Sequence, residues 1–232
     1  MLPCAILCGG LATRLRPITE TVPKSLIPIN GEPFIAHQLR LLRSQGIDRI
    51  VLCAGYLADM IQDVVRDVQM SFDGPQLLGT AGAIRNALPM LGPSFFVLYG
   101  DSYLPCDYAA VERAFAASGR PALMTIYRNE GQFDSSNVEA TEGRIVRYEK
   151  GTRNPALQYI DYGLGVFEAS VFERTTHRDL AEVYRQLLAE GDLASFEVHE
   201  RFYEIGSVKG LRDLDDFLRT VSKGSSTDYL KV

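Results

Sequence analysis

The sequence predicts an α/β fold, namely a doubly wound, mixed but mainly parallel sheet with helices on both faces. Four short apolar runs have the length and composition of strands buried on both faces, at residues 3–8, 50–53, 95–99 and 122–126. The segments between them carry apolar residues at helical spacing. Strands that alternate with helices in this order are typical of a parallel sheet covered on two sides. With 232 residues, the chain has room for one large domain of this kind.

Helices are expected after the turns that end these runs. The first is opened by Pro33 and stops near Gly46, and the second has apolar residues at helical spacing over residues 57–68. A short third helix follows a tight turn at residues 78–82 and reaches about Leu91. The fourth is capped by Asp107. Glycines mark the ends of the first three strands, as Gly9-Gly10, Gly55 and Gly100.

From about residue 129 the pattern changes to shorter segments separated by turns. Strands are expected over residues 137–140, 144–149 and 158–167, and closing helices from about Asp179 and from Ser207. We expect the strands to be antiparallel or mixed and to form the second wall of a cleft. The chain therefore divides into one domain over residues 1–222, with halves at 1–128 and 129–222, and a polar tail at 223–232.

Composition and charge narrow the classes of function. The chain is 46% hydrophobic and 23% charged, as in ordinary soluble globular proteins. Its net charge of −5 argues against a broad nucleic-acid-binding surface, so local cations must bind any phosphate. No stretch is long and apolar enough to cross a bilayer, and the start lacks the basic residues of a signal peptide. A cytoplasmic protein is expected.

The cysteines form no Cys-x-x-Cys pair; they are Cys4, Cys8, Cys53 and Cys106. Three of them lie within or at the end of predicted buried strands. Free cysteine is among the most buried residue types, which favours small core side chains in a reducing compartment. Neither a disulfide nor a cysteine metal site is expected.

The stretch after the first strand carries the strongest chemical signal. Gly9-Gly10 permit positive φ and a close approach of the backbone to a ligand. Arg14, Arg16 and Lys24 follow with almost no acid beside them, which suits a polyphosphate. The alternative is a surface loop with solvated cations. A P-loop would need Gly-Lys-Ser/Thr, and the dinucleotide fingerprint a third glycine, so a dinucleotide-dependent oxidoreductase is disfavoured.

Residues 9–17 read Gly-Gly-Leu-Ala-Thr-Arg-Leu-Arg-Pro, Lys24 follows Pro23, and residues 28–33 read Pro-Ile-Asn-Gly-Glu-Pro. Together they resemble the signature of the sugar-1-phosphate nucleotidyltransferases, with Ala12 in place of the usual glycine. The resemblance spans about residues 2–220. It looks closest to the D-glycero-D-manno-heptose 1-phosphate guanylyltransferase branch, with the N-acetylmuramate 1-phosphate uridylyltransferases second.

This resemblance implies the Rossmann-like fold of the nucleotide-diphospho-sugar transferases, with a nucleotide-binding first half and a sugar-binding second half. It implies Mg²⁺-dependent transfer of a nucleotidyl group from a nucleoside triphosphate to a sugar 1-phosphate, which releases pyrophosphate and gives a nucleotide sugar of the GDP-heptose type. Uridylyl transfer to an amino-sugar 1-phosphate is the alternative. A catalytically silent, nucleotide-sugar-binding regulatory relative is a third reading. Nucleic acid and membrane are not expected as partners, and self-association into a homo-oligomer is left open.

Asp101 directly follows the third buried strand and Gly100. Ligands of open α/β sheets bind beyond the carboxyl ends of the strands, so Asp101 and Gly9-Gly10 are expected at one edge. A carboxylate there suits the Mg²⁺ of a bound polyphosphate, although a turn or capping role is the alternative. The resemblance adds Glu204 as a second metal ligand, at a position where the family usually has Asp. Its alternative is a strand-end glutamate that faces solvent.

The resemblance also implies catalytic roles: Arg14 would hold the leaving pyrophosphate, and Lys24 would bridge the α-phosphate and the sugar phosphate beside Asp101. The implied nucleotide-binding residues are Leu7, Gly9, Gly10, Thr13, Arg14, Gly79, Thr80 and Gly82. The implied sugar-binding residues are Tyr103, Glu149, Lys150, Asp161 and Gly163.

Three of these assignments have structural alternatives. Thr80 can serve as a helix cap. Glu149 and Lys150 can form a solvated charge pair unless the strand ends there. Alternation places Asp161, Gly163 and Gly165 on one strand face, which suits a bound sugar or, alternatively, tight sheet packing.

Overall fold

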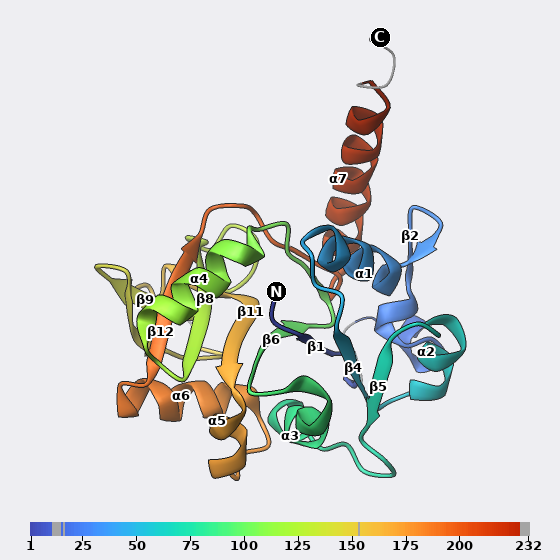
Figure 1. Ribbon diagram of the computed structural model, residues 1–232. Coiled ribbons are helices and arrows are strands. Elements are labelled where there is room, and N and C mark those ends of the chain that lie inside the picture. The colour runs from blue at the N-terminus through green and yellow to red at the C-terminus, as the bar shows by residue number, and fades with distance from the viewer. Residues whose placement is uncertain (11–14, 16, 153, 228–232) are drawn as a thin grey trace.

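The computed structural model describes residues 1–10, 15, 17–152 and 154–227 of the chain. Within these ranges a nine-stranded sheet runs through the centre of the molecule (Figure 1). Its strands are β1 (Cys4–Leu7), β4 (Ile50–Ala54), β5 (Gln69–Phe72), β6 (Ser94–Tyr99), β8 (Ala122–Arg128), β9 (Val138–Thr141), β10 (Arg144–Tyr148), β11 (Tyr159–Glu168) and β12 (Leu193–Val198). The main path is β10-β9-β11-β6-β1-β4-β5, while β8 pairs with β11 and with β12.

The sheet is mixed and mainly parallel, which confirms the predicted fold class. β6, β1, β4 and β5 are parallel neighbours, and β12 is parallel to β8. β11 lies antiparallel between β6 and β8. The fourth predicted strand is therefore present as β8, but it is not the next neighbour of β6. The ten-residue β11 takes that place, and the middle of the strand, from Tyr162 to Phe167, is buried throughout.

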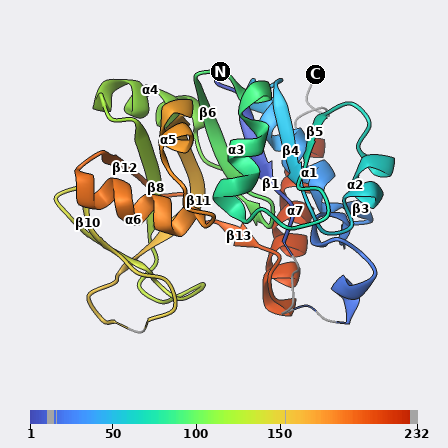
Figure 2. The ribbon, with the colours of Figure 1, turned by 90° about the horizontal axis from the view of Figure 1, so that it is seen from below.

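Helices cover both faces of the sheet (Figures 1 and 2). One face carries α1 (Phe34–Ser44), α2 (Ala58–Val64) and α4 (Tyr108–Ser118), and the other carries α3 (Thr80–Leu91), α5 (Ala169–Arg174) and α6 (Leu180–Glu190). Successive residues of β1 serve opposite cores, since Ile6 packs in the first and Ala5 in the second. This alternation explains why the strand reads as a continuous apolar run.

Several predicted helix boundaries are confirmed. Pro33 directly precedes α1, and Gly46 follows its end with φ +81°. Asp107 caps α4, because its side chain accepts a hydrogen bond from Ala110 N at 2.9 Å. Asp179 caps α6 in the same way.

The predicted helix over residues 57–68 is wrong in its second half. The helix α2 ends at Val64, Val65 is extended, and the chain then forms β5 at the sheet edge. Two of the residues at helical spacing, Met60 and Val64, are 38% and 51% exposed. Their helical spacing therefore does not mark a buried stripe. Residues 69–72 instead pair with β4, which provides hydrogen-bond partners for their backbone groups.

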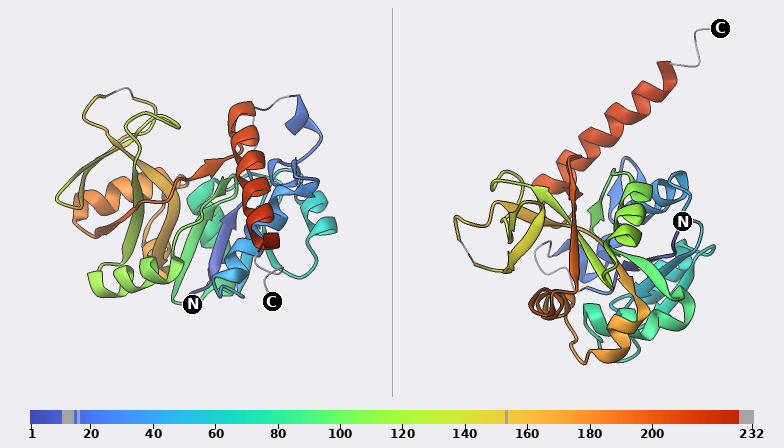
Figure 3. Two further views of the ribbon diagram at one scale, coloured as in Figure 1. Left: turned by 90° about the horizontal axis from the view of Figure 1, so that it is seen from above. Right: turned by 60° about the vertical axis from the view of Figure 1, so that its left-hand side comes forward.

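A smaller layer lies beside the main sheet. It consists of the hairpin β2 (Pro28–Ile29) and β3 (Glu32–Pro33), the ladder β7 (Ser102–Tyr103) and β13 (Tyr203–Glu204), and the helix α7 (Val208–Thr227). Its apolar cluster includes Ile29, Phe34 and Leu214. The far part of α7 projects from the body (Figure 3). The helix continues to Thr227, five residues into the segment predicted as a polar tail. No helix in the described ranges is long and apolar enough to cross a membrane.

Candidate active site

Four parallel strands end side by side at one edge of the sheet. Their order is β6, β1, β4 and β5, and the residues that follow them are Gly100, Cys8, Gly55 and Asp73. Both glycines have close neighbours, which are backbone atoms at Gly100 and mainly side-chain ends at Gly55. A Cβ at Gly100 would lie 2.4 Å from the carbonyl oxygen of Leu7, and a Cβ at Gly55 would lie 2.8 Å from Asp73 Oδ2. The backbone at this edge of the sheet is thus closely packed and carries few side chains.

The first hollow at this rim, here called the glycine pocket, has a volume of about 290 Å³. It is lined by Leu7, Cys8, Gly9, Gly10, Lys24, Ser25, Cys53, Asp73, Leu77, Gly79, Thr80, Ala83, Tyr99, Gly100 and Asp101. Five of the residues expected to bind the nucleotide are among them. Gly82 is not; it is buried in α3, where a Cβ would lie 3.0 Å from the Cβ of Leu78. Thr13 and Arg14 lie outside the described residues.

A second hollow, here called the wide cleft, has a volume of about 550 Å³. It is lined by Leu15, Lys24, Tyr99, Asp101, Ser102, Asp134, Ser135, Ser136, Asn137, Lys150, Gly151, Ile160, Asp161, Tyr162, Gly163, Phe202, Glu204 and Gly206. The wide cleft and the glycine pocket share Lys24, Tyr99 and Asp101. The two hollows therefore meet at one cation and one carboxylate.

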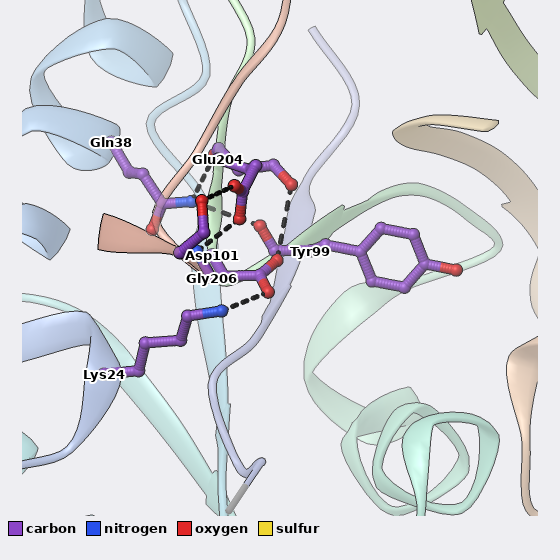
Figure 4. Close-up of polar contacts among 8 residues, drawn as sticks. Lys24, Gln38, Tyr99, Asp101, Glu204 and Gly206 are labelled. Atoms are coloured by element: carbon purple, nitrogen blue, oxygen red, sulfur yellow. Dashed lines mark hydrogen bonds and ion pairs between the residues drawn. The ribbon is translucent and has the colours of Figure 1, made fainter. Parts of the chain in front are cut away.

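Lys24 Nζ donates to Asp101 Oδ2 at 2.7 Å (Figure 4). Lys24 lies in a short 3-10 helix, Lys24–Leu26, and its side chain is only 17% exposed, whereas that of Asp101 is 44% exposed. Gln38 of α1 holds the turn that carries Asp101: its Nε2 donates to the carbonyl oxygens of Tyr99, at 3.2 Å, and Ser102, at 2.7 Å. The sequence predicts that the loop after β1 lies next to the residues that follow β6. The contact between Lys24 and Asp101 shows this arrangement for Lys24.

Glu204 reaches the same place from the C-terminal part of the chain. β13 pairs antiparallel with β7, and Ile205 N donates to the carbonyl oxygen of Asp101 at 2.9 Å. The Glu204 carboxylate accepts hydrogen bonds from Gly206 N and, at 2.8 Å, from Ser207 Oγ (Figure 4). Two carboxylates thus face the wide cleft, Asp101 from the turn directly before β7 and Glu204 from the neighbouring strand β13. Such oxygens are the ligands that Mg²⁺ prefers, and one or two of them are its usual share from protein.

Asp161 anchors the far wall of the wide cleft. Its Oδ2 accepts from the hydroxyls of Tyr99 at 3.3 Å and Tyr148 at 3.2 Å, and its Oδ1 accepts from Gly163 N at 3.1 Å. Burial, with the neighbouring Asp161 charge, raises the pKa of both tyrosines, so they remain neutral donors. Lys150 Nζ donates to Tyr99 Oη at 3.2 Å. The strand β10 ends at Tyr148, as the expected role of Lys150 required.

Asp161 and Gly165 lie on one face of β11, as expected, since their partners in β8, Ile126 and Met124, both pack in the second core. Pairing of β11 with β8 shifts register between Asp161 and Gly165, and Gly163 has φ +99°. Gly165 lies farther along this face, inside the core, where a Cβ would lie 2.3 Å from Tyr184 Oη. Gly165 therefore serves tight packing, while Asp161 and Gly163 line the cleft.

Two residues expected to bind sugar do not line either hollow. Tyr103 packs on Phe217 of α7 with ring centroids 6.2 Å apart, because in β7 it is the preceding Ser102 that lines the cleft. The Glu149 carboxylate accepts from Thr152 Oγ1 at 3.1 Å. Thr80 does not cap α3: its Oγ1 accepts from Leu180 N at 2.7 Å, at the start of α6.

Sequence reasoning missed Gln38, Tyr99, Asn137 and Asp73. Nothing local marks Gln38 or Asn137, since each acts through contacts with distant backbone: Asn137 Oδ1 accepts from Asp161 N at 2.8 Å. Asp73 had a usable signal, namely an acid directly after a strand, but β5 itself was not predicted.

Comparison with known proteins decides the family. A family model described as nucleotidyl transferase matches residues 4–220. The chain belongs to the nucleotidyl transferase family. This confirms the resemblance of the opening motif to the sugar-1-phosphate nucleotidyltransferases.

Among its relatives in this family, the chain is 28% identical over 220 residues to mannose-1-phosphate guanyltransferase beta-B of Xenopus laevis, covering 88% of this chain and 61% of that protein. It is 34% identical over 113 residues to D-glycero-alpha-D-manno-heptose 1-phosphate guanylyltransferase of Campylobacter jejuni, covering 46% of this chain and 51% of that one. The chain thus spans about three-fifths of the length of the curated relatives that it matches over most of its own length.

Two solved structures share the fold. HddC from Yersinia pseudotuberculosis, complexed with GMP-PN, gives a TM-score of 0.77 at 24% identity and covers 94% of this chain and 100% of that one. The inositol-1-phosphate CTP transferase of T. maritima gives 0.81 at 21% identity, with 97% of each chain covered.

Proposed function

We propose that this chain transfers a guanylyl group from GTP to a sugar 1-phosphate, giving a GDP-sugar and pyrophosphate. The observation that carries the proposal is the meeting of the glycine pocket and the wide cleft at Lys24 and Asp101. The glycine pocket would take the nucleotide, whose phosphates suit bare backbone amides. The wide cleft, with Asp161 and Lys150 on its wall, would take the sugar phosphate.

In the proposed reaction a phosphate oxygen of the sugar 1-phosphate attacks the α-phosphorus of GTP. A new bond forms between that oxygen and the α-phosphorus, the bond to the oxygen that leads to the β-phosphorus breaks, and pyrophosphate leaves with its electron pair. Such a transfer depends on positioning and charge stabilisation. Lys24, at the junction of the two hollows, would stabilise charge on both anions as they approach. Arg14, outside the described residues, is proposed to hold the pyrophosphate.

The residues present fit a divalent cation. Asp101 is half exposed at the junction, and Glu204 faces the same cleft with both oxygens oriented by donors from Gly206 and Ser207. We propose that these two carboxylates hold Mg²⁺. When bound, the ion would neutralise charge on the nucleotide phosphates.

Guanine is supported by the relatives, since both the Xenopus and Campylobacter proteins are guanylyltransferases by name. The same names support an acceptor of the manno configuration, either mannose 1-phosphate or D-glycero-D-manno-heptose 1-phosphate. We propose the heptose compound as acceptor, with mannose 1-phosphate the second candidate. A cytoplasmic location stays a prediction.

Pyrophosphate release tests the proposal. The full chain, with Mg²⁺, is assayed with GTP, ATP, CTP, UTP and dTTP against mannose 1-phosphate, heptose 1-phosphate and N-acetylmuramate 1-phosphate. We expect release with GTP and one of the two manno-configured acceptors, and its loss when EDTA removes the metal. Preference for UTP with the amino sugar would move the chain to the uridylyltransferases. Binding of a nucleotide sugar without release from any pair would make it a regulatory relative.

A further inference from the structure

Asp73 occupies the end of the glycine pocket that lies farthest from the reacting groups. It directly follows β5, the outermost of the four parallel strands, while Asp101 follows β6 at the other end of the row. Three strand spacings separate these ends, which is about 14 Å along the sheet edge. A nucleotide with its α-phosphate near Asp101 therefore extends its base toward Asp73. The neighbouring pocket residues are Leu77, Gly79 and Thr80.

The Asp73 carboxylate is held in a fixed position. Its backbone N donates to the carbonyl oxygen of Ala54 at 2.9 Å, and its Oδ2 accepts from Leu78 N at 3.1 Å. Among the described residues, no ion pair reaches this carboxylate, and its one hydrogen bond within the chain comes from the Leu78 amide. Burial raises its pKa, and the hydrogen bond from Leu78 opposes that rise. A half-buried carboxylate with spare acceptor capacity thus lies against the pocket.

We infer that Asp73 is the side chain that selects guanine, by accepting hydrogen bonds from the N1–H and the 2-amino group of the base. An ionised carboxylate only accepts hydrogen bonds. Guanine presents two adjacent donors on its Watson–Crick edge. Uracil and thymine present one N–H between two carbonyl oxygens, and adenine and cytosine present an acceptor nitrogen beside their amino group. Only guanine therefore matches two carboxylate oxygens. The inference rests on the proposed function, since it names the contact that reads the proposed base.

The test is Asp73→Asn, assayed with GTP, inosine triphosphate and xanthosine triphosphate. Inosine triphosphate lacks the 2-amino group, and xanthosine triphosphate has a carbonyl oxygen in its place. Asparagine keeps an oxygen acceptor for Leu78 N, so the loop stays anchored, while its amide group donates to that carbonyl. Wild type should prefer GTP to both analogues by at least tenfold. The variant should lose about 10- to 100-fold in kcat/KM for GTP, through KM, and gain for xanthosine triphosphate.

Asp63→Asn is the matched control, because Asp63 is an exposed aspartate of α2 away from the pocket. It should leave the order of the three nucleotides unchanged. Calorimetric titration of each nucleotide into the full chain, without acceptor, separates this inference from the proposed function. Guanine-selective binding that Asp73→Asn reverses supports the inference even if no sugar phosphate is turned over.

Two results overturn the inference. One is an Asp73→Asn protein, folded by circular dichroism, that keeps the wild-type order of GTP, inosine triphosphate and xanthosine triphosphate. The other needs wild type alone and therefore holds even if the variant does not fold: equal binding of GTP and xanthosine triphosphate, or tighter binding of UTP than GTP. The first result leaves the proposed guanylyl transfer standing.

Discussion

The Lys24 ammonium lies beside two parts of the chain that are remote from it in sequence, Asp101 and Gly206. It pairs with Asp101 at 2.7 Å, and a Cβ at Gly206 would lie only 3.1 Å from its Nζ. A pair with one half-exposed partner contributes at most about 1 kcal/mol to stability. Its position between the two hollows therefore matters more for chemistry than for folding. The absence of a side chain at Gly206 leaves room for the Lys24 ammonium beside the Asp101 carboxylate.

Lys24→Ala should fold normally and lose about 100-fold or more in turnover, because it removes a fixed charge from the place where the two substrates are proposed to meet. Pyrophosphate release and thermal melting measure the two effects. Arg66→Ala, which removes an exposed cation after α2, is the control and should alter neither. Turnover within a few-fold of wild type in Lys24→Ala would remove Lys24 from the proposed reaction.

At the scale of elements, the start of α6 braces the loop before α3. Arg178 donates from its guanidinium to the carbonyl oxygens of Leu77 and Leu78, and its own carbonyl oxygen accepts from Ala81 N at 2.9 Å. A Cβ at Gly79 would lie 2.6 Å from that carbonyl oxygen, and Gly79 has φ +80°. The side of the glycine pocket formed by this loop is thus set by a segment about a hundred residues later in the chain.

Arg178→Ala should raise KM for the nucleoside triphosphate about tenfold and change kcat less than about twofold. It removes two hydrogen bonds that position the loop, each worth about 1 kcal/mol, but touches no reacting group. Steady-state kinetics over nucleotide concentration measures this split. Arg174→Ala removes a comparable exposed arginine, paired with Asp192, and should leave KM unchanged. Equal KM shifts in both variants would contradict a positioning role.

The sequence was most informative where local physics decides the structure. The buried central strands and the caps Asp107 and Asp179 could be predicted because apolar runs and capping side chains act over a few residues. The edge strand β5 could not, since only one of its four residues is buried and its order comes from pairing with β4. Asp73 was missed for the same reason, because it directly follows β5. Lys24 and Asp101 were found through a motif and a strand end, whereas the left-handed φ of Gly163 lies at a register shift that appears only in the pairing with β8.

The whole molecule buries its ionisable thiols in the two cores and at the glycine pocket. All four cysteines are free, and Cys4, Cys53 and Cys106 are buried, as predicted for core side chains. Burial, with nearby charges, raises the pKa of Cys53 and of Cys106 to about 12, and it raises those of Cys4 and Cys8 as well. The folded chain thus keeps protons that the unfolded chain releases near pH 8.5.

Stability should therefore fall as pH rises from about 8.5 toward 12, because the unfolded state loses thiol protons that the folded state retains. Each such thiol contributes a slope of about −1.4 kcal/mol per pH unit in the free energy of unfolding. Urea unfolding between pH 8 and pH 11, with reductant present, measures the slope. Replacing Cys53 and Cys106 by alanine leaves small cavities that lower stability at every pH. It also removes two titrating groups, so the slope of the free energy of unfolding against pH should be less steep by nearly twice the contribution of one thiol. Buried tyrosines add to the decline equally in both proteins and cancel in the comparison. Parallel curves for the two proteins would show that Cys53 and Cys106 do not cause the alkaline loss of stability.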